Sequence, residues 1–178
     1  MSQIYTIGYA TKPIDTFIAQ LKNFDIGVVA DVRSVPYSKA FFDYHQEKLI
    51  ELLKQENVQY VYLGDELGPR SKVPEHYNAD GQVQFKRLMK SPLFIAGVKR
   101  LQKGINKGYK IALTCAEKDA ATCHRSLLIG YELKREYGIE VQHIDHEGGM
   151  ESQGTLEKRL MDWTNTKPGM FTDEKACI

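Results

Sequence analysis

The chain has 178 residues, which is enough for one domain whose apolar core needs neither disulfides nor a structural metal. Its 24 basic and 23 acidic side chains leave a net charge of +1, which excludes the strong overall positive field of nonspecific nucleic-acid binders. The first residues lack the pattern of a secretory signal, and no run approaches the roughly 20 apolar residues of a membrane span. We therefore expect a cytoplasmic protein without a membrane partner. Its oligomeric state is not predicted.

The first half of the chain alternates between strand and helix patterns. Runs rich in β-branched and aromatic residues predict strands at 3–7, 27–32 and 59–63. Helical spacing of apolar residues predicts a helix between each pair of strands, around 14–21 and 49–53. The third strand leads into the segment 64–81, which is polar, irregular and longer than a usual connection, and which we interpret as a candidate lid or binding loop.

The second half continues the alternation. Helical spacing recurs around 94–101 and 127–133, and strands are predicted at 109–115 and 140–144. A last helix is expected at 156–163. This order favours a single-domain, three-layer α/β fold with a mostly parallel sheet of about five strands flanked by helices. We assign residues 1–164 to the domain and 165–178 to a polar tail that contains Cys177.

Reactive and charged side chains follow several predicted strands. In an open parallel sheet, ligands bind beyond the carboxyl ends of the strands, so these positions are the candidate site. We expect two distant segments to share one pocket there. The candidate catalytic residues are Asp31, Cys115, Glu117, Cys123 and His124, and the candidate anion- or substrate-binding residues are Thr6, Gly8, Tyr9, Arg33, Ser34 and Arg125.

The segment from Cys115 to Arg125 is the densest of these groups. A helix that begins near Cys123 would place the thiol at a positive helix terminus, which lowers a thiol pKa and attracts anions. Cys123 or Cys115 could then act as a nucleophile or soft ligand, with Glu117 or Asp31 as a general base. The alternative is that the cysteines are inert buried side chains.

Other chemistries fit the sequence less well. Asp31 and Arg33 could simply pair with each other. His143 and His146 could join the cysteines in a metal site, but the gap from Cys115 to Cys123 is wider than in standard zinc motifs. We therefore predict no metal and no cofactor. A cysteine phosphatase loop needs an arginine six residues after the cysteine, and that position is Ala121 or Ile129 here, so the sequence does not support that mechanism.

Three functions remain open. The first is an enzyme or ligand-binding domain that recognises a small anion, a nucleotide or a nucleic-acid end, with Arg33 and Arg125 holding the anion. The second is a purely structural charge cluster of Asp31, Arg33, Glu117 and Arg125. The third is a non-catalytic nucleic-acid binding module, which the net charge does not support. It would use an aromatic loop around Phe41 and Phe42 and the basic residues Lys39, Arg70, Lys72, Lys86 and Arg87.

The chain also resembles a known family, the domain of unknown function 488 family, from Tyr5 to Ile144. The resemblance implies an α/β fold and a shared cluster of Cys, Glu, His and Arg, without an established reaction. Where many members have Thr-Ile-Gly-His, this chain has Tyr9. The likeness to rhodanese domains is weaker, because Cys115 leads into Ala-Glu-Lys-Asp rather than a tight arginine-containing loop. The residues that carry the family resemblance are Thr6-Ile7-Gly8, Asp31-Val32-Arg33-Ser34 with Pro36 and Ser38, Leu67-Gly68, Cys115-Ala116-Glu117, Cys123-His124-Arg125 and His143-Ile144.

Overall fold

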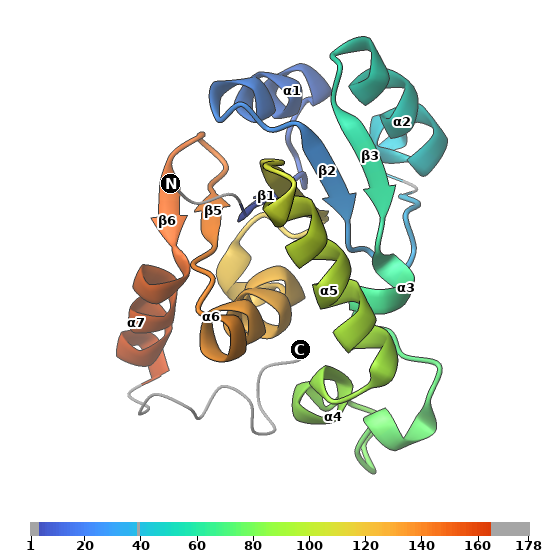
Figure 1. The fold of residues 1–178 in the computed structure, drawn as a ribbon, viewed down its shortest axis with the longest axis vertical. Coiled ribbons are helices and arrows are strands. Elements are labelled where there is room, and N and C mark those ends of the chain that lie inside the picture. Colours follow the sequence, from blue (N-terminus) through green and yellow to red (C-terminus); the bar gives the residue numbers. More distant parts are fainter. Residues whose placement is uncertain (1–3, 39, 165–178) are drawn as a thin grey trace.

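The computed structural model describes residues 4–38 and 40–164, and these form an α/β fold around one sheet (Figure 1). The sheet has six strands in the order β3-β2-β4-β1-β5-β6. The first five in this order are parallel, and β6 runs antiparallel to β5. The strands are β1 (Ile4–Gly8), β2 (Val28–Asp31), β3 (Gln59–Tyr62), β4 (Ile111–Cys115), β5 (Gln142–Ile144) and β6 (Met150–Ser152).

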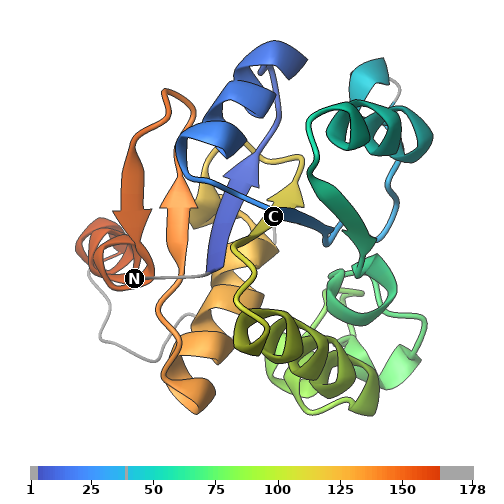
Figure 2. The same cartoon turned by 45° about the horizontal axis from the view of Figure 1, so that its top comes forward.

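Helices cover both faces of the sheet, as the alternation of strands and helices predicts (Figure 2). Side chains of α1 (Ile14–Asn23) and α2 (Gln46–Gln55) pack on one face, and those of α5 (Pro92–Asn106) and α6 (Tyr131–Tyr137) pack on the other. Alternation along β2 divides its side chains between the two cores, with Val28 and Ala30 facing α5 and Val29 facing α1 and α2. The remaining helices are α3 (Gly64–Leu67), α4 (Phe85–Met89) and α7 (Gln153–Thr164).

Three local features differ from the sequence-based expectation. A sixth strand, β6, was not predicted, because Met-Glu-Ser lacks β-branched and aromatic residues. The expected irregular segment 64–81 begins with the buried turn of α3, whose Leu67 is fully buried beside α5. The helix expected near Cys123 is preceded by a short 3₁₀ turn, η3 (Ala120–Thr122), and starts as a π-helical segment, η4 (Arg125–Gly130), which continues into α6.

The chain leaves the neighbouring strands β1 and β4 towards opposite faces of the sheet. After β1 it enters α1 on one face, and after β4 it enters η4 and α6 on the other. The carboxyl ends of strands that diverge in this way are where open α/β sheets bind ligands. At these ends Gly8 stands opposite Cys115 in the β1·β4 register.

Within the described part of the chain, no helix has the length and apolar character needed to cross a lipid bilayer. The predicted tail at 165–178, with Cys177, lies outside the described residues.

Candidate metal centre

Four metal-ligating side chains converge at the end of β4. Cys115 is the last residue of the strand, Glu117 lies in the loop that follows, and Cys123 and His124 lie between η3 and η4. One ligand atom from each residue lies within 4.8 Å of all the others. Glu117 Oε2 is 2.8 Å from Cys115 Sγ and 3.1 Å from Cys123 Sγ, and His124 Nδ1 is 3.7 Å from each sulfur.

The imidazole of His124 is held in one orientation by the backbone of the neighbouring strand. Its Nε2 lies 3.0 Å from the carbonyl oxygen of Val32, just beyond β2. Because a carbonyl only accepts, Nε2 carries the hydrogen and donates it. In the neutral imidazole, that assignment leaves the lone pair of Nδ1 directed towards the two sulfur atoms.

The four residues differ in their access to solvent. Cys115, Cys123 and His124 are buried, at 4%, 1% and 7% exposure, whereas Glu117 is exposed. The cluster therefore has a closed side of two sulfur atoms and one nitrogen and an open side formed by a carboxylate.

Arg125 fixes the loop that carries Glu117. Its Nη1 donates to the backbone oxygen of Glu117 at 2.6 Å, and its Nη2 donates to that of Lys118 at 3.2 Å. The side chain is 1% exposed, its Nε has no hydrogen-bond partner, and no ion pair joins it to a carboxylate of a described residue. A Cβ at Gly8 would lie 1.9 Å from the Glu117 oxygen and 2.9 Å from Nη1, so only glycine at this position lets β1 approach the loop.

The electrostatics of the cluster separate the two thiols. A hydrogen bond with Cys123, together with burial, raises the pKa of Cys115 well above its usual value. Burial opposes ionisation of Cys123 too, but the Cys115 bond and the positive charges of Arg125 and His124 lower its pKa to about 5. Burial also disfavours the charged forms of Glu117 and His124. Hydrogen bonds from the two thiols nevertheless lower the pKa of Glu117. Contacts with Cys123 raise the pKa of His124.

Asp31 and Arg33 lie apart from this cluster. Their side chains belong to the face covered by α1 and α2, whereas Cys115 and Cys123 pack on the opposite face. The guanidinium bonds Asp31 through Nε and Nη2, and its Nη1 donates to Tyr9 Oη at 3.1 Å and to the Tyr44 carbonyl at 2.8 Å. This placement corrects the expectation that the two segments share one pocket. Among the described residues, a hydrogen bond from His124 Nε2 to the Val32 carbonyl connects the cluster to the end of β2.

The hydrogen bonds of the Arg33 guanidinium hold it inside the protein, away from the cysteines. Burial disfavours its charged form, but the bonds to Asp31 and Tyr9 outweigh burial and raise its pKa. Ser34 is occupied as well, because its Oγ accepts from the backbone N–H of Arg70 at 3.0 Å and its carbonyl accepts from Tyr62 at 3.2 Å. Neither residue faces the thiols.

The candidates Thr6 and His143 form a separate buried contact. Thr6 Oγ1 lies 2.8 Å from His143 Nδ1, and His143 Nε2 lies 2.8 Å from Gln153 Oε1. His143 and His146 do not belong to the group of ligand atoms around Cys115. Gln153 and the Val32 carbonyl were missed by sequence reasoning, because a glutamine and a backbone oxygen carry no motif.

Apart from Lys39, the basic residues proposed for nucleic-acid binding lie within one stretch of the chain, from 70 to 87. Lys39 lies outside the described residues, while Arg70, Lys72, Lys86 and Arg87 are exposed. Arg87 is used locally, since it donates to the carbonyls of Glu75 and Tyr77. In the aromatic loop, Phe42 is 68% exposed.

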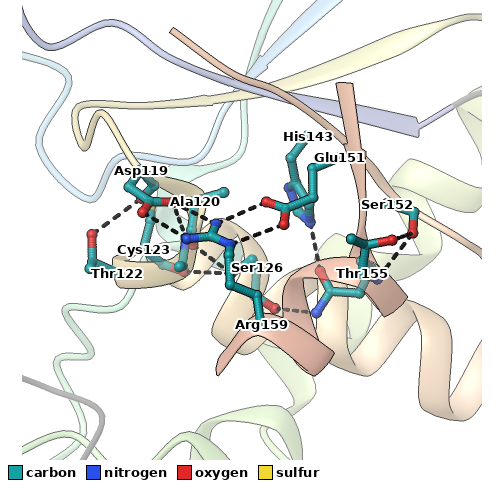
Figure 3. Close-up of polar contacts among 12 residues, drawn as sticks. Asp119, Ala120, Thr122, Cys123, Ser126, His143, Glu151, Ser152, Thr155 and Arg159 are labelled. Atoms are coloured by element: carbon teal, nitrogen blue, oxygen red, sulfur yellow. Dashed lines mark hydrogen bonds and ion pairs between the residues drawn. The ribbon is translucent and has the colours of Figure 1, made fainter. Parts of the chain in front are cut away.

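A cavity of about 550 Å³ lies on the far side of the same loop, between η3, the β5–β6 hairpin and α7. Lys118, Asp119 and Ala120 contribute to its wall, but none of the four ligand residues does. The guanidinium of Arg159 in the cavity wall donates hydrogen bonds to the carboxylates of Asp119 and Glu151, so its charge is already neutralised (Figure 3).

Comparison with known proteins gives one match. The family model described as domain of unknown function DUF488 matches residues 13–132. The matched segment contains all four clustered ligand residues and excludes Thr6-Ile7-Gly8, His143-Ile144, β6 and α7. No curated protein and no solved structure matches the chain.

Proposed function

The chain belongs to the DUF488 family, and we propose that its functional centre is a zinc site at which the protein, as an enzyme or ligand-binding domain, recognises a small anion or nucleotide. Cys115, Cys123 and His124 hold the ion on the buried side. Glu117 takes the fourth position, which the incoming anion reaches from solvent.

The convergence of the four ligand atoms carries this proposal. With Zn–S bonds of about 2.3 Å and Zn–N bonds of about 2.0–2.1 Å, a sulfur and a nitrogen on one tetrahedral ion lie about 3.6 Å apart. His124 Nδ1 is 3.7 Å from each sulfur. The Glu117 oxygen is closer to both sulfurs than a tetrahedral edge, and a carboxylate on an exposed loop residue can retreat by less than about 1 Å to admit the ion.

The surroundings of His124 support the same proposal. Metal-bound histidines usually donate their second ring N–H to a carbonyl or carboxylate, which fixes the tautomer and the ring plane. The bond from His124 Nε2 to the Val32 carbonyl is of this kind. The spacing of Cys115 and Cys123 along the chain argued against a metal, but spacing no longer decides once the fold brings the ligands together.

The charge balance gives an independent reason. Two thiolates and one carboxylate on a divalent ion leave a net charge of −1. A buried guanidinium without a counter-ion is costly. Arg125 hydrogen-bonds only backbone carbonyls, forms no ion pair with a carboxylate of a described residue, and lies beside the loop of Glu117. An anionic metal centre would place a further negative charge beside this guanidinium.

The open side of the cluster favours a site that binds a ligand over a closed structural site. Catalytic zinc sites have three protein ligands and an exchangeable fourth position, whereas structural sites are closed. Here three ligands are buried and the fourth, Glu117, is exposed. Every nitrogen of the Arg33 guanidinium already donates a hydrogen bond within the protein, so the anion predicted from the sequence would be held by the metal in place of Glu117.

Metal content and cobalt substitution test the site. Protein purified under reducing conditions should contain one zinc ion per chain, measured by elemental mass spectrometry. The Co²⁺-substituted protein should show thiolate-to-metal charge-transfer absorption. Cys115→Ser, Cys123→Ser and His124→Gln should each abolish both signals. Cys177→Ser is the matched control and should change neither.

Two outcomes contradict the proposal in different parts. If the purified protein contains no metal and iodoacetamide readily alkylates Cys123, the residue acts as a thiol nucleophile and the zinc site is contradicted. A cobalt spectrum that does not change on addition of phosphate or adenosine monophosphate, in the natural protein and in Glu117→Ala, would leave a structural metal and remove anion recognition.

A further inference from the structure

A π-helical turn, η4, directly follows Cys123 and His124. In η4, the backbone N–H of Tyr131 reaches the carbonyl of Ser126, five residues back, so the turn is wider than an α-helix. Such turns are rare and concentrate at functional sites. Ser126 also joins η4 to η3, because its hydroxyl donates to the Ala120 carbonyl at 2.5 Å. Cys123 therefore lies between two short helical turns, η3 and η4, that the Ser126 hydroxyl joins.

A glutamine from α7 reaches this turn across the molecule. Gln153 is 1% exposed, and its Nε2 donates to the Ser126 carbonyl at 3.3 Å and to Glu157 Oε1 at 3.0 Å. Its Oε1 faces His143 Nε2 at 2.8 Å. Both amide hydrogens and the amide oxygen are thus used. Figure 3 labels two of the partners, Ser126 and His143.

The orientation of this network is consistent from end to end. The amide oxygen of Gln153 can only accept, so His143 Nε2 carries the ring hydrogen and donates to it, and His143 Nδ1 accepts from the Thr6 hydroxyl. The amide nitrogen then faces Ser126. Thr6, His143, Gln153 and Ser126 are all at most 2% exposed, so no solvent competes for these bonds.

The turn is shaped to receive the amide. A Cβ at Gly130 would lie 2.3 Å from Gln153 Oε1 and 3.2 Å from the Arg125 carbonyl. Only glycine at this position allows the glutamine to approach the π turn so closely. The contact is therefore matched on both sides, by a buried amide and by the missing side chain opposite it.

We propose that Gln153 is a positioning residue of the metal centre, which holds η4 so that Cys123 and His124 face Cys115. This inference rests on the proposed zinc site. It extends the centre beyond the family-matched residues, because Gln153 belongs to α7. Without the amide, the Ser126 carbonyl keeps only its backbone bond, and the π turn loses the contact that holds it against β5 and β1.

Two substitutions separate the bonds that Gln153 makes. Gln153→Met keeps the length of the side chain and removes every hydrogen bond, whereas Gln153→Glu keeps an acceptor for His143 and loses the donor to Ser126. We expect both to weaken zinc affinity, measured by competition with a chromogenic chelator, by about 10- to 100-fold, as partners beyond the direct ligands typically do. The cobalt spectrum should shift in both variants.

A variant that destabilises the fold elsewhere is the control. Ser91→Ala removes the cap of α5, a helix to which the Gln153 side chain makes none of its hydrogen bonds, and should leave zinc affinity unchanged. Gln153 variants that bind zinc as tightly as Ser91→Ala would overturn the inference.

A second measurement does not depend on the metal. In metal-free protein, Cys123 is 1% exposed, so its alkylation by iodoacetamide reports opening of the turn. Gln153→Met should be alkylated faster than both the natural protein and Ser91→Ala; equal rates would overturn the inference even where the natural protein binds no zinc. If only the zinc site is wrong, the natural protein will contain no metal, but Cys123 will still be alkylated faster in Gln153→Met than in the natural protein.

Discussion

Arg33 and Asp31 form a buried ion pair, with side chains 5% and 0% exposed, so the stability of the fold should depend strongly on both residues. Removing one member leaves the other charge unpaired in the core. Arg33→Met should therefore lower the free energy of unfolding by about 3–5 kcal/mol, measured by urea titration. Zinc affinity should not change, because the pair lies on the other face of the sheet from the cysteines.

The double variant Asp31→Asn with Arg33→Met should recover much of that loss, since no unpaired charge then stays buried. Tyr60→Phe provides a milder comparison, as it removes only the 2.7 Å bond to Asp31 and should cost about 1–3 kcal/mol. A single Arg33→Met variant as stable as the natural protein would show that the pair contributes no net stability.

The sequence predicted which residues would gather at the strand ends, but not the face on which each would lie. Asp31 stands opposite Thr114 in the β2·β4 register, one position before Cys115. Side chains alternate along strands, so Asp31 and Cys115 point to opposite faces. That conclusion needs the register between strands, which depends on tertiary packing and is not encoded locally.

At the scale of elements, the start of α5 shows how local sequence defines a boundary. Ser91 accepts a hydrogen bond from the backbone N–H of Phe94 at 3.2 Å, and Pro92 occupies the first helical position. Ser91→Ala should lower the free energy of unfolding by about 1 kcal/mol in urea titration, because one helix N–H loses its partner. Ser91→Asp should restore most of it, and an alanine variant of unchanged stability would contradict the capping role.

Elements with a clear period were predictable, and those defined by distant partners were not. The five strands and the helices on both faces follow from apolar spacing and β-branched runs. The π turn depends on Gln153, which lies 27 residues beyond Ser126. Strand β6 forms because it pairs with β5, and its own three residues have little strand preference.

The whole molecule is joined by the same buried network that supports the proposed centre. The chain of bonds from Thr6 through His143 to Gln153 connects β1, β5 and α7, and Gln153 carries it on to η4. Arg159 adds a second tie on the surface, from α7 to Asp119 before η3 and to Glu151 on β6. The part of the chain beyond the family-matched residues is therefore bonded directly to the loop that carries the cysteines.

This network makes the stability of the fold depend on pH through His143. Burial lowers its pKa to about 4, and the positive charges of Arg125 and Arg159 act in the same direction, against the opposing bond to Gln153. In the unfolded chain the imidazole takes up a proton near pH 6.5, whereas in the folded protein it does so only near pH 4. As the pH falls between these values, the unfolded state binds a proton that the folded state excludes, so stability decreases.

The contribution of His143 is therefore fully present above about pH 6.5 and declines towards about pH 4, for a total of about 3 kcal/mol. Urea titrations across this range should show the decline in the natural protein and a shallower one in His143→Gln, because glutamine at position 143 does not titrate. The slope is the quantity to compare, since the substitution also disturbs the bonds to Thr6 and Gln153 and lowers stability at every pH. If both proteins lose stability with the same slope, the imidazole is not kept neutral by its burial, and the direction of hydrogen bonding from Thr6 to Gln153 must be reversed or broken.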